Sequence, residues 1–172
     1  MTAATADWLS TATGAWTLDP AATTISLRTK AMWLLDVKAT FKALEGSGTV
    51  SPEGIVTGTL VVDASSVDTG NAKRDKHLLT EDFFEVGAHP AITYTAKSAV
   101  PAADGTWTVA GSLTIRGKPL PLNLSATAAQ SDPDRVTVTA EAAVDRSLWG
   151  MTWRKMGAGL HNEIVVIAVF RK

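Results

Sequence analysis

The sequence predicts an all-β protein whose antiparallel strands close into a barrel. Three observations lead to this prediction: apolar and polar residues alternate along most of the chain, turn sequences recur at short intervals, and no linker divides the 172 residues. Alternation with period two is typical of strands that have one apolar and one solvated face. The short intervals leave little room for helical crossovers, which disfavours a parallel sheet. Closure removes exposed sheet edges, and a two-sheet sandwich is the structural alternative.

Alternation marks most strands in order along the chain. Residues 1–14 are rich in Thr, Ala and Ser and are interpreted as a flexible arm, so that residues 15–172 form the barrel domain. Alternating segments follow at residues 24–28, 36–41, 92–95, 112–116, 120–125 and 136–142. Residues 60–62 and 164–170 are apolar on both faces, so a helix or the arm is expected to cover their outer sides.

Residues 69–85 interrupt the alternation. Leu78, Leu79 and Phe83 recur at helical spacing, which predicts a short helix over 72–79, followed by a turn that carries Phe83 and Phe84. A second helical turn is expected near residues 32–35.

Composition restricts the class of protein. Hydrophobic residues make up 45% and charged residues 19%, as in a folded domain. The 16 basic and 17 acidic side chains give a net charge of -1, which argues against a nucleic-acid partner. Without cysteine there is no disulfide, thiolate metal site or cysteine nucleophile. The first fifteen residues lack the basic and apolar regions of a secretory signal, and no apolar run reaches the ~20 residues of a membrane span. We therefore expect a cytoplasmic protein without stable membrane insertion.

Seven short motifs carry a family resemblance: Trp-Thr-Leu-Asp-Pro at 16–20, Val-Asp-Thr-Gly-Asn at 67–71, Arg74-Asp75-x-His77-Leu78, Asp-Phe-Phe-Glu at 82–85, His-Pro-Ala-Ile-Thr at 89–93, Gly-Ser-Leu-Thr-Ile-Arg-Gly at 111–117 and Asp-Arg-Ser-Leu-Trp-Gly-Met at 145–151. In this order, over about residues 16–171, they resemble the YceI-like, polyisoprenoid-binding, lipocalin-like proteins. The resemblance implies an extended eight-stranded antiparallel barrel with one or two short helices. It also implies a long apolar channel for an isoprenoid chain, such as a polyprenyl phosphate or a quinone tail, and no catalytic residue set.

The chain departs from the pattern of that family in three places. Family members often carry a secretion signal, a His in the second strand and a Gly before the Phe of the next strand. Here no signal is seen, residues 29–32 read Thr-Lys-Ala-Met, and Phe41 follows Ala39 and Thr40. The last two differences bear on the ligand head group and on the shape of the channel mouth.

An isoprenoid tail offers no hydrogen-bonding group, so its site should be a tunnel of apolar side chains. Each buried methylene contributes ~0.8 kcal/mol. The alternative is that these side chains only form the core. The candidates are Ile25, Leu27, Met32, Trp33, Leu34, Phe41, Leu60, Phe84, Tyr94, Leu113, Ile115, Leu122, Trp149, Trp153 and Met156.

Tryptophan and basic residues suggest where a mouth would lie. Trp149 and Trp153, with methionines nearby, suit an adaptable apolar mouth, and the alternative is that they plug a barrel end. An anionic head group would need cations there. The head-group candidates are Lys30, Arg74, Arg154 and Lys155. The alternative for Arg74 is structural, as a pin for the helix, and Arg146 is also interpreted as a structural pin.

These observations predict that the protein binds, carries or sequesters a long apolar ligand and is not an enzyme. His77, His89 and His161 share no metal-site spacing, and no cofactor is required beyond a bound polyisoprenoid or quinone-like lipid. One alternative is a stress-response or interaction module with a side-chain-filled barrel, and another is a scavenger of hydrophobic antibiotics. An enzyme acting on an apolar substrate would need a polar pair in the lumen, such as Tyr94 with a His or Asp. The apolar segment 164–170 and exposed strand edges would permit a homodimer.

Overall fold

The computed structural model describes residues 12–31, 35–154 and 158–172. Strands dominate this part of the chain, with one short α-helix and two 3-10 turns. None of the helices described is long and apolar enough to cross a membrane. The elements are β1 (Gly14–Leu18), η1 (Pro20–Ala22), β2 (Thr24–Ala31), β3 (Leu35–Val50), β4 (Val56–Asp68), α2 (Ala72–Leu78), β5 (Ala91–Pro101), β6 (Trp107–Ile115), β7 (Lys118–Asp132), β8 (Arg135–Asp145), η2 (Arg146–Trp149) and β9 (His161–Arg171).

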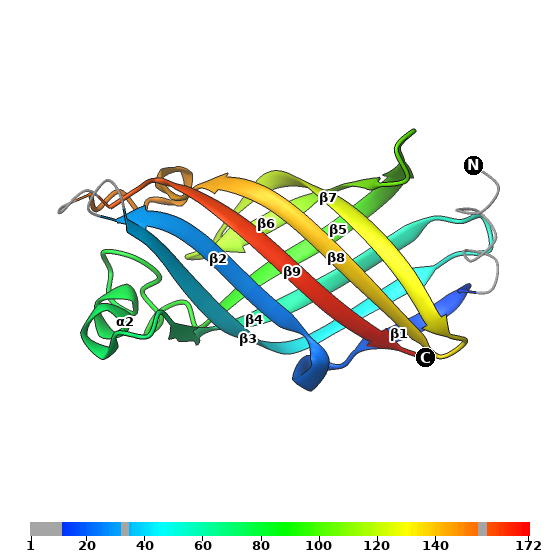
Figure 1. The fold of residues 1–172 in the computed structure, drawn as a ribbon, viewed down its shortest axis with the longest axis horizontal. Coiled ribbons are helices and arrows are strands. Elements are labelled where there is room, and N and C mark those ends of the chain that lie inside the picture. The colour runs from blue at the N-terminus through cyan, green and yellow to red at the C-terminus, as the bar shows by residue number, and fades with distance from the viewer. Residues whose placement is uncertain (1–11, 32–34, 155–157) are drawn as a thin grey trace.

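The strands close into an antiparallel barrel, as the sequence predicts. Neighbouring strands pair in sequence order from β3 to β9, and β2 joins β9 to β3 and so completes the ring. β1 pairs with β3 and β9 beyond the end of β2, so β1 and β2 share one of eight places around the barrel. The turn η1 separates them, and it is capped by the Asp19 side chain, which accepts a hydrogen bond from the Ala22 N–H. Figure 1 shows the resulting elongated barrel, with α2 at one end.

The register places one apolar face of every strand toward the barrel axis. Along β8 and β9, Ala140 lies opposite Val166, and Ala142 lies opposite Ile164. The residues between them point outward, where Glu141 is exposed. This is the alternation seen in the sequence, and a slip of one residue would turn the apolar side chains into solvent.

The helix α2 ends one residue earlier than predicted. Asn71 caps its start by accepting a hydrogen bond from the Arg74 N–H, and Leu79 is its C-cap. The chain then turns back, because the Phe84 N–H donates to the Leu78 carbonyl. The expected turn carrying Phe83 and Phe84 is therefore present. Residues 32–34, where a second helical turn is expected, lie outside the described residues, and Leu35 already belongs to β3.

The structure corrects the expectation that the outer face of β9 is covered, and it describes only part of the predicted arm. The outer face of β9 is covered only in part: η1 shields Val169, whose carbonyl accepts from the Asp19 N–H, but Ile167 is 40% exposed. Threonines flank Ile167 on both neighbouring strands, so its exposed side chain lies between Thr24 and Thr139. The predicted arm lies outside the described residues up to residue 11. Within that predicted arm, Ala12 is fully buried and Gly14 already pairs with Val50.

Gly111 allows the only tyrosine of the chain to lie across the inside of β6. A Cβ at residue 111 would lie 2.2 Å from the Thr95 carbonyl oxygen and 2.7 Å from the Tyr94 hydroxyl. We expect Gly111→Ala to lower the free energy of unfolding by about 2 kcal/mol and Tm by roughly 6 °C, because the sheet must shift to accept the methyl group. Thermal and urea denaturation measure both quantities. Gly87→Ala is the control, since nothing lies within 4 Å of a Cβ there. Equal stability of the two variants would contradict this packing.

Candidate functional site

An elongated channel runs inside the barrel. Its volume is about 280 Å³, and residues of all nine strands line it. Several lining side chains, including Leu60, Leu122 and Ile164, point inward yet stay only half-buried. In a filled core such residues would be covered on every side. The lumen is therefore hollow, and the side-chain-filled barrel is not what the structure shows.

Small residues keep the channel open. Ala96, Ala126 and Ala140 are in the lining, where larger side chains would meet across the axis. Gly48 also faces the lumen, and the Phe170 ring lies 3.7 Å from the place where its Cβ would be. Aromatic rings thus lie flat against the wall at the glycines instead of crossing the lumen.

The lining offers almost no polar group to a ligand. The Tyr94 hydroxyl donates to the Leu122 carbonyl at 2.8 Å, and the Trp16 indole N–H donates to the Ala12 carbonyl at 2.7 Å. The hydroxyls of Thr49 and Thr57 bond to each other at 2.6 Å. None of the described lining residues is charged. Chemically, this wall can recognise a ligand by shape and apolar area.

The polar pair that an enzyme would need is not found in this lining. Tyr94 has a backbone carbonyl as its partner, and no His or Asp is among the described lining residues. Nor does the described part of the chain hold a cluster of His, Asp and Glu that could bind a metal ion.

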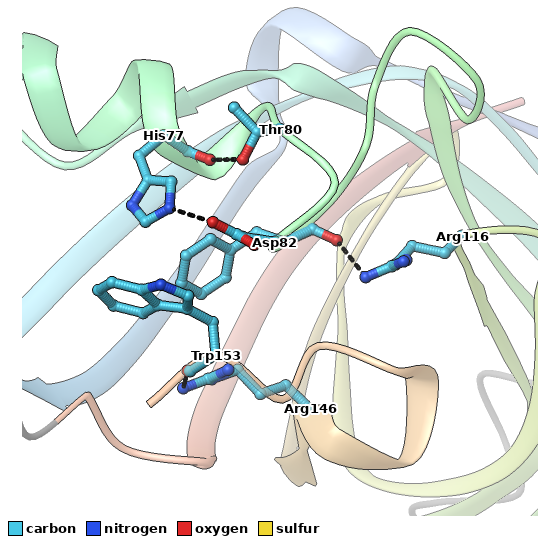
Figure 2. Close-up of polar contacts among 7 residues, drawn as sticks. His77, Thr80, Asp82, Arg116, Arg146 and Trp153 are labelled. Carbon is cyan, nitrogen blue, oxygen red and sulfur yellow. Dashed lines mark hydrogen bonds and ion pairs between the residues drawn. The ribbon is translucent and has the colours of Figure 1, made fainter. Parts of the chain in front are cut away.

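An aromatic cluster lies at the α2 end of the barrel. We call Phe83, Trp149, Met151 and Trp153 the α2-end cluster; the first three are buried, and Trp153 packs against them. The His77 ring meets Trp153 edge-on at 4.7 Å between centroids, and its Nε2 lies 2.7 Å from a carboxylate oxygen of Asp82. Figure 2 shows this arrangement beneath α2. The Trp149 indole N–H donates to the Leu113 carbonyl at 3.0 Å, which ties the cluster to the barrel wall.

Arg146 holds the chain after the cluster in place. The residue is only 7% exposed. Its guanidinium donates to the carbonyls of Met151 at 2.6 Å and Trp153 at 2.7 Å, and its Nε donates to the Gly159 carbonyl at 2.9 Å. It also lies over the Phe83 ring, 5.2 Å from the centroid. Burial lowers the pKa of Arg146 from its ordinary value, but a guanidinium stays charged in proteins. Every one of these contacts is internal, as expected of a structural pin.

Nine of the predicted ligand contacts lie in the channel wall. They are Ile25, Leu27, Phe41, Leu60, Phe84, Tyr94, Leu113, Ile115 and Leu122. Trp149 and Trp153 are not among the lining residues and belong to the α2-end cluster, so their position corresponds to the plug alternative. Met32, Trp33, Leu34 and Met156 lie outside the described residues.

Of the head-group candidates, the two whose side chains the structure describes, Arg74 and Arg154, are not among the channel-lining residues. Arg74 donates to the Thr69 hydroxyl at 2.8 Å and to its carbonyl at 3.0 Å, which is the structural alternative for this residue. Arg154 is exposed beside Trp153. Lys155 and the side chain of Lys30 lie outside the described part of the chain.

Sequence reasoning missed the lining residues at the end of the barrel away from α2. There the wall includes Val56, Ala99, Val109, Val138 and Phe170. The alternation of apolar and polar residues could have identified them: Val138, for example, alternates with Thr137 and Thr139.

Tyr94 reports on the lumen because it is the only tyrosine in the chain. Burial raises its pKa from 10.0 to about 12. The fold thus favours the neutral phenol, so this contribution to stability is complete below about pH 10 and is lost as the pH rises through about 12. An ultraviolet titration of tyrosinate should show one transition near pH 12 in the folded protein and near 10 in urea. Titration near 10 in both states would contradict a buried Tyr94.

A family model described as the YceI-like domain matches residues 16–170. Among curated relatives, a UPF0312 protein of Yersinia enterocolitica is 41% identical over 76 residues, which are 43% of this chain and 39% of that protein. A UPF0312 protein of Vibrio cholerae is 31% identical over 101 residues, or 56% of this chain and 53% of that protein. The chain thus spans about half or less of the length of these relatives.

Solved structures show the same fold at low sequence identity. Burkholderia cenocepacia BcnA superposes with a TM-score of 0.77 at 20% identity, covering 88% of this chain and 98% of that one. A polyisoprenoid-binding domain from Saccharophagus degradans, described as implicated in plant cell wall breakdown, gives 0.74 at 18% identity and covers 91% and 97%. Because the family match extends over nearly all of the barrel, this chain belongs to the YceI-like family.

Proposed function

We propose that this protein binds a long apolar ligand in the barrel channel, with an isoprenoid or quinone-type tail as the preferred class, and carries or sequesters it. The observation that carries the proposal is the uniform chemistry of the channel wall. Side chains from all nine strands present carbon to the lumen, and the hydroxyl of Tyr94 and the indole N–H of Trp16 are turned to backbone carbonyls.

An apolar wall of this kind is better suited to a hydrocarbon tail than to a compact polar molecule. A tail gains ~0.8 kcal/mol for each methylene removed from water, so binding energy grows with the length of chain inside the channel. The energy must exceed the cost of ordering the tail and of association itself. A charged head group finds no partner in the described lining, so we propose that it stays outside the lumen.

The family supports the same class of ligand. One structural neighbour is described as a polyisoprenoid-binding domain. At 18% sequence identity, this neighbour supports a shared fold. For the present chain, an isoprenoid ligand is a proposal that rests on the apolar channel.

A pair of leucines tests the proposal, because Leu60 lines the channel while Leu44 is 50% exposed on the barrel surface. Leu60→Gln places an amide in the lumen, where a bound tail cannot hydrogen-bond to it. The cost of about 2 kcal/mol should weaken binding about 30-fold. Leu44→Gln is the matched control and should leave affinity unchanged. The measurement is quenching of tryptophan fluorescence by a short-chain ubiquinone with an isoprenoid tail.

Both variants should first match the wild type in circular dichroism and in thermal unfolding within a few degrees. Equal affinity of the two variants would contradict a ligand in the channel. Absence of binding by the wild-type protein, at concentrations where the quinone is dispersed, would contradict the proposed function itself.

A further inference from the structure

We propose that the ligand enters and leaves through a lateral gap in the barrel wall between β4 and β5, at the end away from α2. This inference rests on the proposed function and adds the route by which the channel is loaded. We call the separation between residues 56–57 of β4 and residues 97–101 of β5 the β4–β5 gap.

The gap begins where the pairing of these two strands stops. β4 and β5 pair from Asp63 opposite Ala91 to Gly58 opposite Ala96. β5 nevertheless continues to Pro101, and from Ser98 onward it pairs with β6. On the other side, Val56 and Thr57 remain paired with β3. Within the described strands, the hydrogen-bonded ring is therefore interrupted at this corner.

A β-bulge explains the separation. The register between β5 and β6 shifts between Ala96 and Ser98, which leaves Lys97 as the extra residue. A bulge bends its strand and increases the local twist. The β5–β6 hairpin thus bends away from β4, which remains paired with β3. Figure 1 shows the β3–β4 and β5–β6 hairpins separating at the end opposite α2.

The channel reaches this gap. Its lining includes Val56 and Thr57 on one side and Ala99 and Val109 on the other. The small Ala99 leaves space between the two strands. On the outer rim, Ile55 is 57% exposed and Val100 is 60% exposed, so apolar side chains flank the opening from both hairpins. An apolar tail passing through would touch carbon on both sides.

The opposite end offers a less favourable route through the described residues. There Phe83, Trp149 and Met151 are buried against the barrel wall, and the hydrogen bonds of Arg146 tie down the chain that follows. Passage at that end would require this cluster to separate, whereas the β4–β5 gap needs no backbone hydrogen bond to break.

A covalent bridge across the gap tests the route, and the absence of cysteine from the sequence makes its attachment specific. Ile55→Cys and Val100→Cys, joined by a bismaleimide, place a tether over the opening. Lys118→Cys with Leu148→Cys is the matched bridge at the α2 end, where the Lys118 side chain reaches the Leu148 carbonyl at 2.9 Å. Stopped-flow quenching with the short-chain ubiquinone gives both rate constants.

We expect the bridge over the gap to slow association and dissociation alike, each by about tenfold or more, with little change in Kd, because a route affects rates without altering the bound state. The α2-end bridge should leave both rates unchanged. Each single-cysteine variant, capped with a monofunctional maleimide, controls for the modification. Unchanged rates in the gap-bridged protein would overturn the proposal, as would slowing only by the α2-end bridge.

Ala99→Trp provides a second test that needs no cross-link. The indole should narrow the gap and slow both rates, while circular dichroism and thermal unfolding report whether the fold is kept. If the wild-type protein binds the quinone but neither Ala99→Trp nor the gap bridge changes the rates, the route is wrong and the proposed function stands. If the wild-type protein does not bind, both fail.

Discussion

The closed ring of backbone hydrogen bonds is the constraint on which the rest of this structure depends. β2 completes the ring by pairing with β9 on one side and β3 on the other, and β1, which precedes the turn η1, pairs with the same two strands beyond the end of β2. Once eight places are joined in a circle, the interior is wide enough either to be filled by large inward side chains or to hold one slender ligand. The hollow lumen thus follows from closure combined with small residues such as Ala126, Ala140 and Gly48 on the inner face.

The two ends of the barrel are built differently. At the α2 end, the side chains of the α2-end cluster pack against the barrel wall, and Arg146 donates to carbonyls that the irregular chain leaves without strand partners. At the other end, the bulge at Lys97 marks the point beyond which the β3–β4 and β5–β6 hairpins are no longer paired with each other. The barrel thus has a closed wall, an apolar lumen and one corner where β4 and β5 are not paired, which is suited to holding a slender chain. None of the described lining residues forms a catalytic group.

Much of this arrangement could be read from the sequence, because alternation fixes which side chains face inward. Ile25 and Leu122 alternate with polar neighbours in the sequence, and both line the channel. Trp149 and Trp153 could not be placed, since their position depends on hydrogen bonds from Arg146 to carbonyls that have no sequence signature. The bulge at Lys97 was equally hidden: one extra residue in a strand leaves the composition unchanged, and its place depends on the register with β6. Exposure of Ile167 depends on the threonines opposite it in two other strands.

Native mass spectrometry of the wild-type protein tests the central claim most directly. The freshly purified protein is measured, then incubated with an excess of the short-chain ubiquinone and measured again, and each sample is extracted with organic solvent to identify what is released. We expect a discrete complex of one chain with one apolar molecule, either a lipid carried through purification or the added quinone. A mass equal to that of the bare chain in both samples, with nothing recovered in the extract, would contradict the claim that the channel is a binding site.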